Sequence, residues 1–260
     1  MRARPSRRDL SQVAGAGYNA GMTSRVAVLA SGSGSNLQSL LDHLHGNRQN
    51  TGDRAGAAEV VLVASNRADA RALDRGRAAG AATAVLNDVD DGDALAALLD
   101  DHAVDLVVLA GYLKLVPASV VRRYPGRMLN VHPALLPSFG GPGMYGRRVH
   151  EAVLHSGARV SGVTVHFVDE EYDRGTIIAQ WPVPVLPGDD AVTLAARVLS
   201  AEHILYPRVV EAVAAGRLSE RGQRPPASSH SHLQPASSVH FSLTVEPAAL
   251  AAGMDQLLSL

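Results

Sequence analysis

The stretch RVAVLASGSGSNLQSLLDHL, residues 25–44, joins an apolar run, a glycine-rich turn and a helical pattern. Its first part is almost continuously apolar, as is typical of a parallel strand that is buried on both faces of a sheet. From Ser35 onward the apolar residues return at helical spacing. A strand, a tight turn and a helix in this order predict the first unit of an α/β fold.

The same alternation of strand and helix continues to about Gly216. It predicts an open, mostly parallel twisted sheet with helices on both faces and a Rossmann-like first half. Two later segments alternate apolar and polar residues, which favours an antiparallel pair. The predicted strands are 25–32, 59–65, 82–86, 105–111, 128–132, 161–169 and 176–185, and the predicted helices are 35–44, 68–79, 94–102, a short one from Pro117, 147–155 and 189–215.

The composition fits one globular domain with flanking extensions. The chain has 260 residues, 46% of them hydrophobic, a formal net charge of −1 and no cysteine. This charge favours neither nucleic acid nor an anionic membrane as a partner, and no apolar run reaches the ~20 residues that span a bilayer. We predict a disordered N-terminal extension (1–24), a folded α/β domain (25–216) and a mostly disordered C-terminal tail (217–260), in which 248–260 has helical propensity.

The turn SGSGSN, residues 31–36, follows the first predicted strand and opens the first helix. Its glycines let the backbone approach a ligand closely, and the free N–H groups at a helix start attract an anion. Leu37 replaces the third glycine of a dinucleotide fingerprint, and the second strand ends in ASN (64–66) without an acidic residue. The pattern therefore favours a single phosphate over NAD, with an ordinary tight turn as the alternative.

A polar pair lies at the end of an apolar strand in MLNVHPALLP, residues 128–137. Asn130 and His132 alternate with apolar residues, so both project from the same side of the strand. At the carboxyl end of a strand they point into the crevice where α/β sheets bind ligands. A core histidine is the structural alternative, but it does not explain the neighbouring Asn130 or the stiff, proline-rich exit.

The segment VDEEYDRGTIIAQ, residues 168–180, joins the two predicted antiparallel strands. Its four carboxylates are most simply a solvated turn. Asp173 stands at the tightest part, just before Arg174 and Gly175, and it reaches His132 if the turn folds over the crevice. A carboxylate in contact with the imidazole would raise the pKa of His132 and hold its orientation.

Three motifs together, SGSGSNLQ (31–38), NVHPALLPSF (130–139) and GVTVHFVDEEYDRGTIIAQ (162–180), resemble the phosphoribosylglycinamide formyltransferase family. They occur in the family's order with similar gaps, and the resemblance spans about 25–216, which it identifies as the catalytic domain. It implies the formyltransferase fold and a reaction of purine synthesis. In that reaction the formyl group of 10-formyltetrahydrofolate, a co-substrate, passes to the amine of glycinamide ribonucleotide, and no metal is implied.

The resemblance also assigns roles to residues. The catalytic trio falls on Asn130, His132 and Asp173. Asn130 and a protonated His132 are expected to donate hydrogen bonds to a tetrahedral oxyanion, and Asp173 is expected to keep His132 charged and correctly turned. The expected ribonucleotide site is Gly34, Ser35, Asn36 and Glu202; the expected folate site is Leu113, Lys114, Leu115, Val116, Val168, Asp169 and Asp173; and Thr164 and His166 are expected to line the same site.

Some of these positions have a simpler structural interpretation. Without the resemblance, Glu202 would be an exposed carboxylate of the last helix. Thr164 and His166 would be ordinary residues on the second face of a strand. The family often has a cis bond before the second proline of its strand exit, so the resemblance also implies a cis peptide at Leu136–Pro137.

The sequence departs from the family pattern at two places. SFGGPGMYGRR (138–148) replaces the commoner PG-x-H-x-H version of the loop. An arginine that relatives keep near the third helix, close to the phosphate, is absent, because the region reads DDGDALAAL (90–98). Arg147 or Arg148 is our hypothesis for its substitute.

Three alternative functions share part of the pattern. Formyltetrahydrofolate hydrolase has the same trio but carries a regulatory domain before the catalytic part, for which the 24 residues ahead of the first strand are too few. Methionyl-tRNA formyltransferase adds a basic barrel domain, for which the tail is too short and too neutral. A non-catalytic nucleotide-binding module would keep the phosphate loop without needing the trio.

The expected partners are small molecules, namely glycinamide ribonucleotide and the formyl folate, without nucleic acid or membrane. A homodimer is compatible with the sequence, which has no feature that demands one. The absence of cysteine fits a reducing compartment. The expected location is the cytoplasm.

Overall fold

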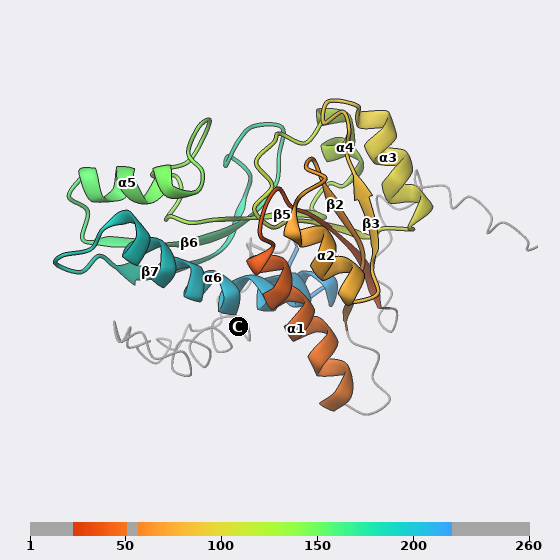
Figure 1. Ribbon diagram of the computed structural model, residues 1–260, viewed down its shortest axis with the longest axis horizontal. Coiled ribbons are helices and arrows are strands. Elements are labelled where there is room, and N and C mark those ends of the chain that lie inside the picture. Colours follow the sequence, from red (N-terminus) through yellow and green to blue (C-terminus); the bar gives the residue numbers. More distant parts are fainter. Residues whose placement is uncertain (1–22, 51–56, 220–260) are drawn as a thin grey trace, which may run out of the picture.

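The structure is a computed structural model that describes residues 23–50 and 57–219 (Figure 1). The predicted N-terminal extension up to residue 22 and the tail from residue 220 lie outside the described residues, as does the segment 248–260 with its helical propensity. Among the helices that the structure describes, none is long and apolar enough to cross a membrane.

Strands and helices alternate along the described chain, as predicted. Most of their ends differ from the predicted ones by one to three residues, and α1 continues beyond its predicted end. The strands are β1 (Ser24–Leu29), β2 (Ala58–Ser65), β3 (Ala82–Val85), β4 (Leu106–Leu109), β5 (Met128–His132), β6 (Val160–Phe167) and β7 (Ile177–Pro184). The helices are α1 (Ser35–Asn50), α2 (Arg71–Ala78), α3 (Gly92–Asp101), α4 (Ala118–Arg123), α5 (Arg147–His155) and α6 (Ala191–Ala214).

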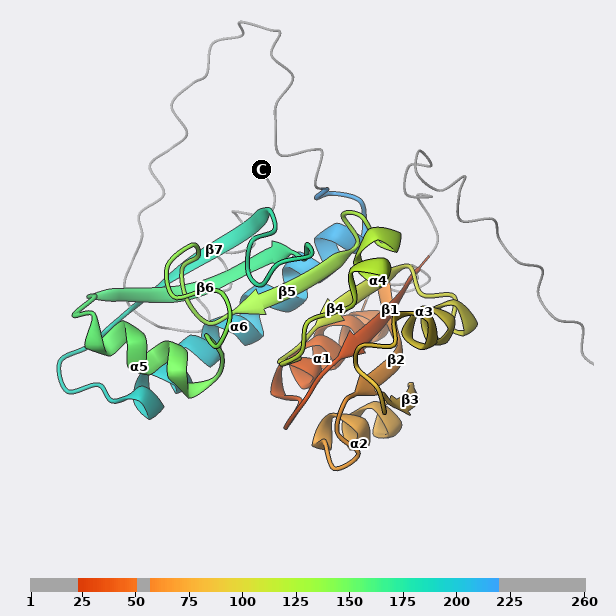
Figure 2. The ribbon, with the colours of Figure 1, turned by 90° about the horizontal axis from the view of Figure 1, so that it is seen from above.

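The seven strands form one sheet in the order β3-β2-β1-β4-β5-β6-β7 (Figure 2). Strands β1 to β5 pair in parallel, whereas β6 pairs antiparallel with both β5 and β7. The mostly parallel sheet and its antiparallel end confirm the predicted fold class. The chain grows from β1 to β3 on one side and then crosses to β4 on the other, so a crevice is expected outside the carboxyl ends of β1 and β4.

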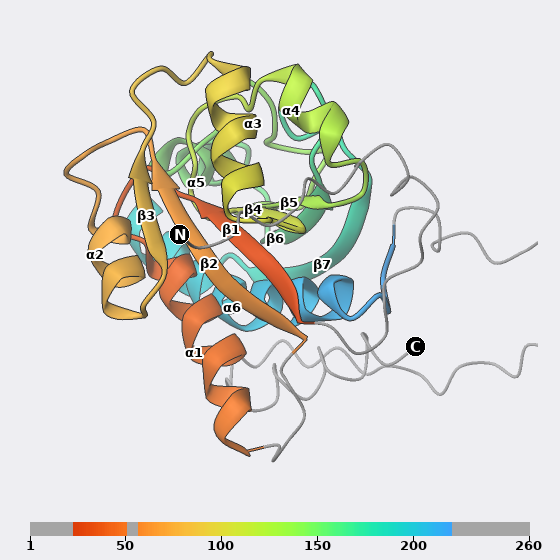
Figure 3. The same ribbon diagram turned by 90° about the vertical axis from the view of Figure 1, so that its right-hand side faces the viewer.

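Helices cover both faces of the sheet (Figure 3). On one face, Leu40 of α1 and Leu205 of α6 belong to the same buried cluster as Val28 of β1. On the other face, Leu99 of α3 packs in a second cluster with Leu29 of β1. Successive residues of β1 are thus buried on opposite faces, which explains why its sequence is a nearly continuous apolar run.

Helix α6 also fixes the base of the crevice. The hydroxyl of its fully buried Tyr206 lies 2.9 Å from the carbonyl oxygen of Leu109 and 3.1 Å from that of Leu129. These carbonyls belong to the neighbouring strands β4 and β5. One side chain therefore ties together the two strands whose ends carry the predicted site.

The turn between β6 and β7 is a place where only glycine fits. A Cβ added at Gly175 would collide with the carbonyl oxygen of Phe167, whereas a Cβ at Gly157, with φ of 73°, meets nothing within 4 Å. We expect Gly175→Ala to lower the free energy of unfolding by about 2 kcal/mol or more, because of this collision. Gly157→Ala should lower it by about 1 kcal/mol, because only the positive φ disfavours a side chain there. Urea unfolding of both variants measures this, and equal losses would contradict it.

Candidate active site

A cavity of about 680 Å³ opens at the carboxyl ends of β4 and β5. Its wall brings together segments that are far apart in the sequence: Asn36, the loop 111–116, Asn130, His132, the turn 168–173 and Glu202. Gly34 and Ser35 lie beside Asn36 at the start of α1 but outside this wall. All residues predicted for the folate site, Leu113, Lys114, Leu115, Val116, Val168, Asp169 and Asp173, line the cavity.

The polar pair of β5 points into this cavity, as its alternation predicted. His132 is 4% exposed, and its Nε2 donates a hydrogen bond of 2.8 Å to the carbonyl oxygen of Phe139. Its other ring nitrogen, Nδ1, lies 3.5 Å from Asp173 Oδ2. The turn 168–176 folds over the crevice and brings Asp173 to His132, which was the condition for the predicted contact.

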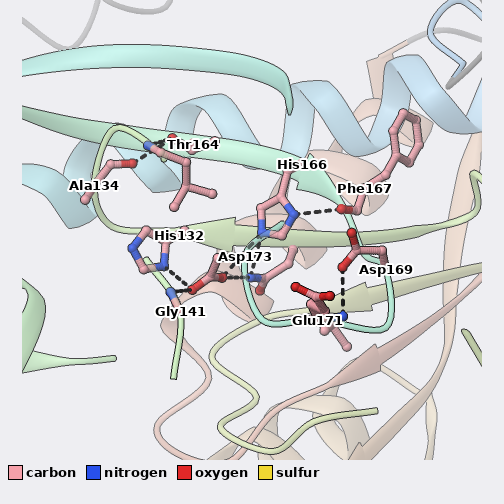
Figure 4. Close-up of polar contacts among 12 residues, drawn as sticks. His132, Ala134, Gly141, Thr164, His166, Phe167, Asp169, Glu171 and Asp173 are labelled. Carbon is pink, nitrogen blue, oxygen red and sulfur yellow. Dashed lines mark hydrogen bonds and ion pairs between the residues drawn. The ribbon is translucent and has the colours of Figure 1, made fainter. Parts of the chain in front are cut away.

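The carboxylate of Asp173 lies at the centre of a cluster of polar groups (Figure 4). It accepts a hydrogen bond of 2.9 Å from Gly141 N–H and one of 3.5 Å from Asn130 Nδ2. His166 Nε2 approaches its Oδ1 to 3.6 Å. Asp173 has a positive φ of 57°, a conformation that non-glycine residues rarely adopt and that directs its side chain inward here.

The charges in the cluster differ in part from the expectation. Burial lowers the pKa of His132, although Asp173 and the Phe139 carbonyl act in the opposite direction. The carboxylate therefore has the predicted sign of effect on this pKa, but desolvation outweighs it, and a protonated His132 in the reaction stays a prediction. Burial alone would raise the pKa of Asp173; His166, His132 and the Gly141 N–H together lower it, so Asp173 is an anion.

Thr164 does not line the cavity, contrary to the prediction. It is fully buried, and its hydroxyl donates to the carbonyl oxygen of Ala134 at 2.7 Å while accepting from the N–H of Leu136 at 3.0 Å. It thereby fixes the proline-rich exit of β5. The peptide Leu136–Pro137 in this exit is cis, as the resemblance implied. His166, by contrast, does line the cavity.

The wall of the cavity also holds a buried carboxyl group. Glu202 of α6 is 7% exposed, so its interpretation as an exposed helix carboxylate is wrong. Asn36 Nδ2 donates to Glu202 Oε2 at 2.6 Å, and the Oδ1 of Asn36 has no hydrogen-bond partner in the described chain. Burial raises the pKa of Glu202 to about 7, although the bond from Asn36 acts against it. An acceptor without a partner beside an ionisable carboxyl suits a polar ligand.

The wall on the folate side is largely apolar. Leu113 and Leu115 are 47% and 40% exposed. Their side chains form an apolar surface that a planar ligand can cover. The loop that carries them is anchored to the first turn, because Leu113 N–H donates to the Ser31 hydroxyl at 3.0 Å. Tyr112, which no sequence motif predicted for the site, has a buried hydroxyl without a hydrogen-bond partner among the described residues. Burial and nearby Asp90 raise the pKa of Tyr112 to about 12.

The unusual loop 138–148 contributes backbone groups to the cluster. The carbonyl of Phe139 accepts from His132, and the N–H of Gly141 donates to Asp173. Sequence analysis missed these groups because every residue type carries a carbonyl and nearly every one an N–H. It also missed His150 of α5, which lines the cavity with a buried Nδ1 that has no hydrogen-bond partner in the described chain. Burial, and then His132, lower the pKa of His150.

Arginine near the phosphate loop comes from an unexpected position. Arg75 of α2 donates from Nε to the carbonyl oxygen of Ser33 at 2.9 Å and from Nη1 to Gln38 Oε1 at 2.7 Å. Arg147 lines the cavity and pairs with Glu151, and Arg148 lies over the ring of Tyr145, with 5.2 Å to its centroid. Arg147 and Arg148 belong to α5, whereas Arg75 contacts the phosphate loop itself through the carbonyl of Ser33.

Comparison with known proteins identifies the family. A family model described as Formyl transferase matches residues 24–210. The chain belongs to the formyl transferase family. It is 43% identical over 204 residues to the chloroplastic phosphoribosylglycinamide formyltransferase of Arabidopsis thaliana, covering 76% of this chain and 68% of the relative. To the phosphoribosylglycinamide formyltransferase of Haemophilus influenzae it is 38% identical over 200 residues, covering 75% of this chain and 89% of the relative.

Solved structures of this family share the fold. Glycinamide ribonucleotide transformylase 1 from Symbiobacterium toebii matches with a TM-score of 0.69 and 40% identity, over 78% of this chain and 92% of the other. Phosphoribosylglycinamide formyltransferase from Brucella melitensis matches with a TM-score of 0.65 and 42% identity, over 75% and 97%. The resemblance noted in the sequence is therefore confirmed.

The buried carboxyl of Glu202 predicts a pH-dependent stability. Its pKa rises from 4.5 to about 7 on folding, so the folded state of the wild-type protein is penalised increasingly as the pH rises through this range. Glu202→Gln has no charge and keeps an acceptor for Asn36. We expect it to raise the free energy of unfolding by about 3 kcal/mol at pH 8 and by under about 1 kcal/mol at pH 5.

Urea unfolding of the wild-type protein and of Glu202→Gln at the two pH values measures this difference. Comparison of the two proteins at each pH cancels the titration of all other groups. An equal gap at pH 5 and pH 8 would show that Glu202 does not titrate in this range.

Proposed function

We infer that the chain transfers the formyl group of 10-formyltetrahydrofolate to the amine of glycinamide ribonucleotide, a step of de novo purine (IMP) biosynthesis. The observation that carries this proposal is the anionic Asp173 that gathers Asn130 and His132 in one cavity. The chain belongs to the formyl transferase family. Relatives that match most of its length are named phosphoribosylglycinamide formyltransferase.

Two parts of the cavity wall suit the two substrates. We propose that Gly34, Ser35 and Asn36 bind the phosphate of the ribonucleotide at the start of α1, with Glu202 beside its amino end. The folate lies against the apolar wall of 113–116 and the turn residues Val168, Asp169 and Asp173. The formyl carbon and the amine then meet beside the trio. The folate is a co-substrate, and no step requires a metal.

The reaction follows from the groups of the trio. The amine nitrogen attacks the formyl carbon, and the carbonyl oxygen becomes an oxyanion. His132, once protonated, donates a hydrogen bond to that oxygen, and Asn130 contacts the reacting groups beside it. Asp173 stabilises the charged imidazole. The intermediate collapses when the carbon–N10 bond breaks, and N10 leaves as tetrahydrofolate with the proton that the amine has lost.

Two alternatives make different demands on this site. Formyltetrahydrofolate hydrolase would use the same trio with water as the nucleophile and would not need the ribonucleotide. A non-catalytic nucleotide-binding module would not need a buried carboxylate beside His132. The bacterial relative agrees with a cytoplasmic enzyme, whereas the plant relative is named chloroplastic. A homodimer stays a prediction for measurement in solution.

Formyl transfer by the purified protein tests the proposal directly. We expect turnover that depends on both glycinamide ribonucleotide and 10-formyltetrahydrofolate. His132→Asn and Asp173→Asn should each lower kcat by about 10²–10³-fold, because each removes one group that stabilises the oxyanion or its donor. The spectroscopic change of the folate on loss of its formyl group measures the rate.

The chain offers matched controls on its surface. His155 and Asp101 are exposed and do not line the cavity, so His155→Asn and Asp101→Asn should keep wild-type rates. Consumption of the folate without the ribonucleotide would identify a hydrolase. Absence of any turnover in the wild-type protein would favour the binding module.

The phosphate end gives a second prediction. Because Arg75 touches the carbonyl of Ser33 in the phosphate loop, we propose that it replaces the arginine that the third helix lacks. Arg75→Ala should weaken binding of glycinamide ribonucleotide about tenfold through loss of one charge-assisted contact. Arg147→Ala and Arg148→Ala should leave the Kd near the wild-type value, which isothermal titration calorimetry measures. If Arg147→Ala raised the Kd more than Arg75→Ala, Arg147 of α5 would be the arginine that binds the phosphate.

A further inference from the structure

His150 of α5 lines the cavity but has no part in the function proposed above. It is 4% exposed, and its Nδ1 is buried without a hydrogen-bond partner in the described chain. Its Nε2 likewise forms no hydrogen bond with the described residues. Because protein atoms cover Nδ1, Nε2 is the ring nitrogen that can meet a ligand in the cavity. A buried histidine whose ring nitrogens have no protein partner suits a polar ligand.

The wall around His150 is otherwise largely apolar. Helices α5 and α6 pack against each other (Figure 2). Apart from Glu202, the residues with which α6 lines the cavity are apolar, namely Ala191, Val192, Ala195 and Leu199. On α5, Arg147 also lines the cavity, but its guanidinium is bonded to Glu151 at 2.7 Å. His150 and Glu202 are therefore the polar groups that these two helices offer to a ligand.

The surroundings of His150 favour an uncharged partner. Burial lowers the pKa of His150, and nearby His132 lowers it further, so the ring favours its uncharged form at neutral pH. A phosphate prefers cations and the N–H groups of a helix start, which α1 supplies. A hydroxyl group and a neutral imidazole can each donate and accept a hydrogen bond, so they form a pair whichever ring nitrogen carries the hydrogen.

Glycinamide ribonucleotide carries uncharged hydroxyl groups between its two ends. Its ribose links the phosphate to the amino end and has free hydroxyls at C2′ and C3′. The proposed function gives partners to the phosphate and to the amine but none to these hydroxyls. His150 lines the cavity that holds both ends, and it lies close enough to His132 for its pKa to respond. A wall without a polar group here would leave a covered hydroxyl unpaired.

We propose that His150 binds a ribose hydroxyl of the ribonucleotide through Nε2 and thereby selects a ribonucleotide over a deoxyribonucleotide. This proposal rests on the function proposed above. A site built to bond a hydroxyl discriminates strongly against an analogue without it, because the protein group is then left unpaired. The hydroxyl does not react, so its bond is the same in the bound substrate and in the transition state. The contact therefore lowers the KM for the ribonucleotide and leaves kcat nearly unchanged.

The 2′-deoxy and 3′-deoxy analogues of glycinamide ribonucleotide test this selection in the wild-type protein. The analogue that lacks the bonded hydroxyl should have a KM and a Kd about tenfold above those of the natural substrate, because one hydrogen bond is lost. Rates of formyl transfer give KM, and isothermal titration calorimetry gives Kd. Equal constants for all three ribonucleotides would overturn the proposal.

A cycle of substrate and protein changes assigns the contact to His150. In His150→Leu, the KM and Kd for the natural substrate should rise about tenfold, and removal of the bonded hydroxyl should raise them no further. His150→Gln keeps an amide that can bond a hydroxyl, so it should retain part of the preference. His155→Leu on the same helix is exposed and outside the cavity wall, so it should keep the wild-type preference. Losses that multiply in His150→Leu for both analogues would contradict the assignment.

Stability separates recognition of the sugar from a structural role. Because Nδ1 has no partner in the described chain, His150→Leu should keep the free energy of unfolding near the wild-type value or raise it. A lower free energy of unfolding together with equal losses for all three ribonucleotides would indicate a structural role and overturn the proposal. A wild-type protein that binds the ribonucleotide without formyl transfer would contradict the proposed function instead, while the Kd values would still decide the role of His150.

Discussion

The carboxylate of Asp173 is the group on which the order of the site depends. It accepts the N–H of Gly141 and lies 3.5 Å from Nδ1 of His132 and 3.6 Å from Nε2 of His166. These partners come from β5, from β6 and from the loop after Pro137. Without a charge at their centre, two imidazoles and one amide would have several hydrogen-bond arrangements of similar energy. One buried anion selects a single arrangement, as electrostatic preorganisation requires.

Asp173 reaches this position because the turn between β6 and β7 doubles back over the sheet. The turn begins where Val168 N–H donates to the carbonyl of Met128 at 2.8 Å, at the start of β5. It then returns along β5 with Asp173 at a positive φ, and Gly175 packs against Phe167 where no Cβ fits. The antiparallel end of the sheet therefore has a functional consequence, since a tight turn can join the antiparallel neighbours β6 and β7, whereas parallel neighbours need a long crossover.

The sequence predicted what side-chain patterns encode. Apolar periodicity located the strands and helices, and the spacing of Asn130 and His132 at a strand end located the crevice. Side-chain patterns could not predict the contacts of the Phe139 carbonyl and the Gly141 N–H, because backbone groups are common to all residue types. Burial was equally hidden: whether Glu202 is covered depends on how α6 packs against α1, and the sequence of one helix does not contain that information.

Burial also decides when the cluster becomes charged. In the free protein, Asp173 is an anion, and burial keeps the pKa of His132 below its ordinary value. In the proposed reaction, the attacking amine becomes acidic at the same step in which the formyl oxygen becomes negative. A proton passed from that amine to His132 would create an imidazolium beside Asp173 at the moment when the oxyanion needs a donor. An imidazole that is already charged could not accept this proton, so the downward shift that burial gives the pKa of His132 favours this route.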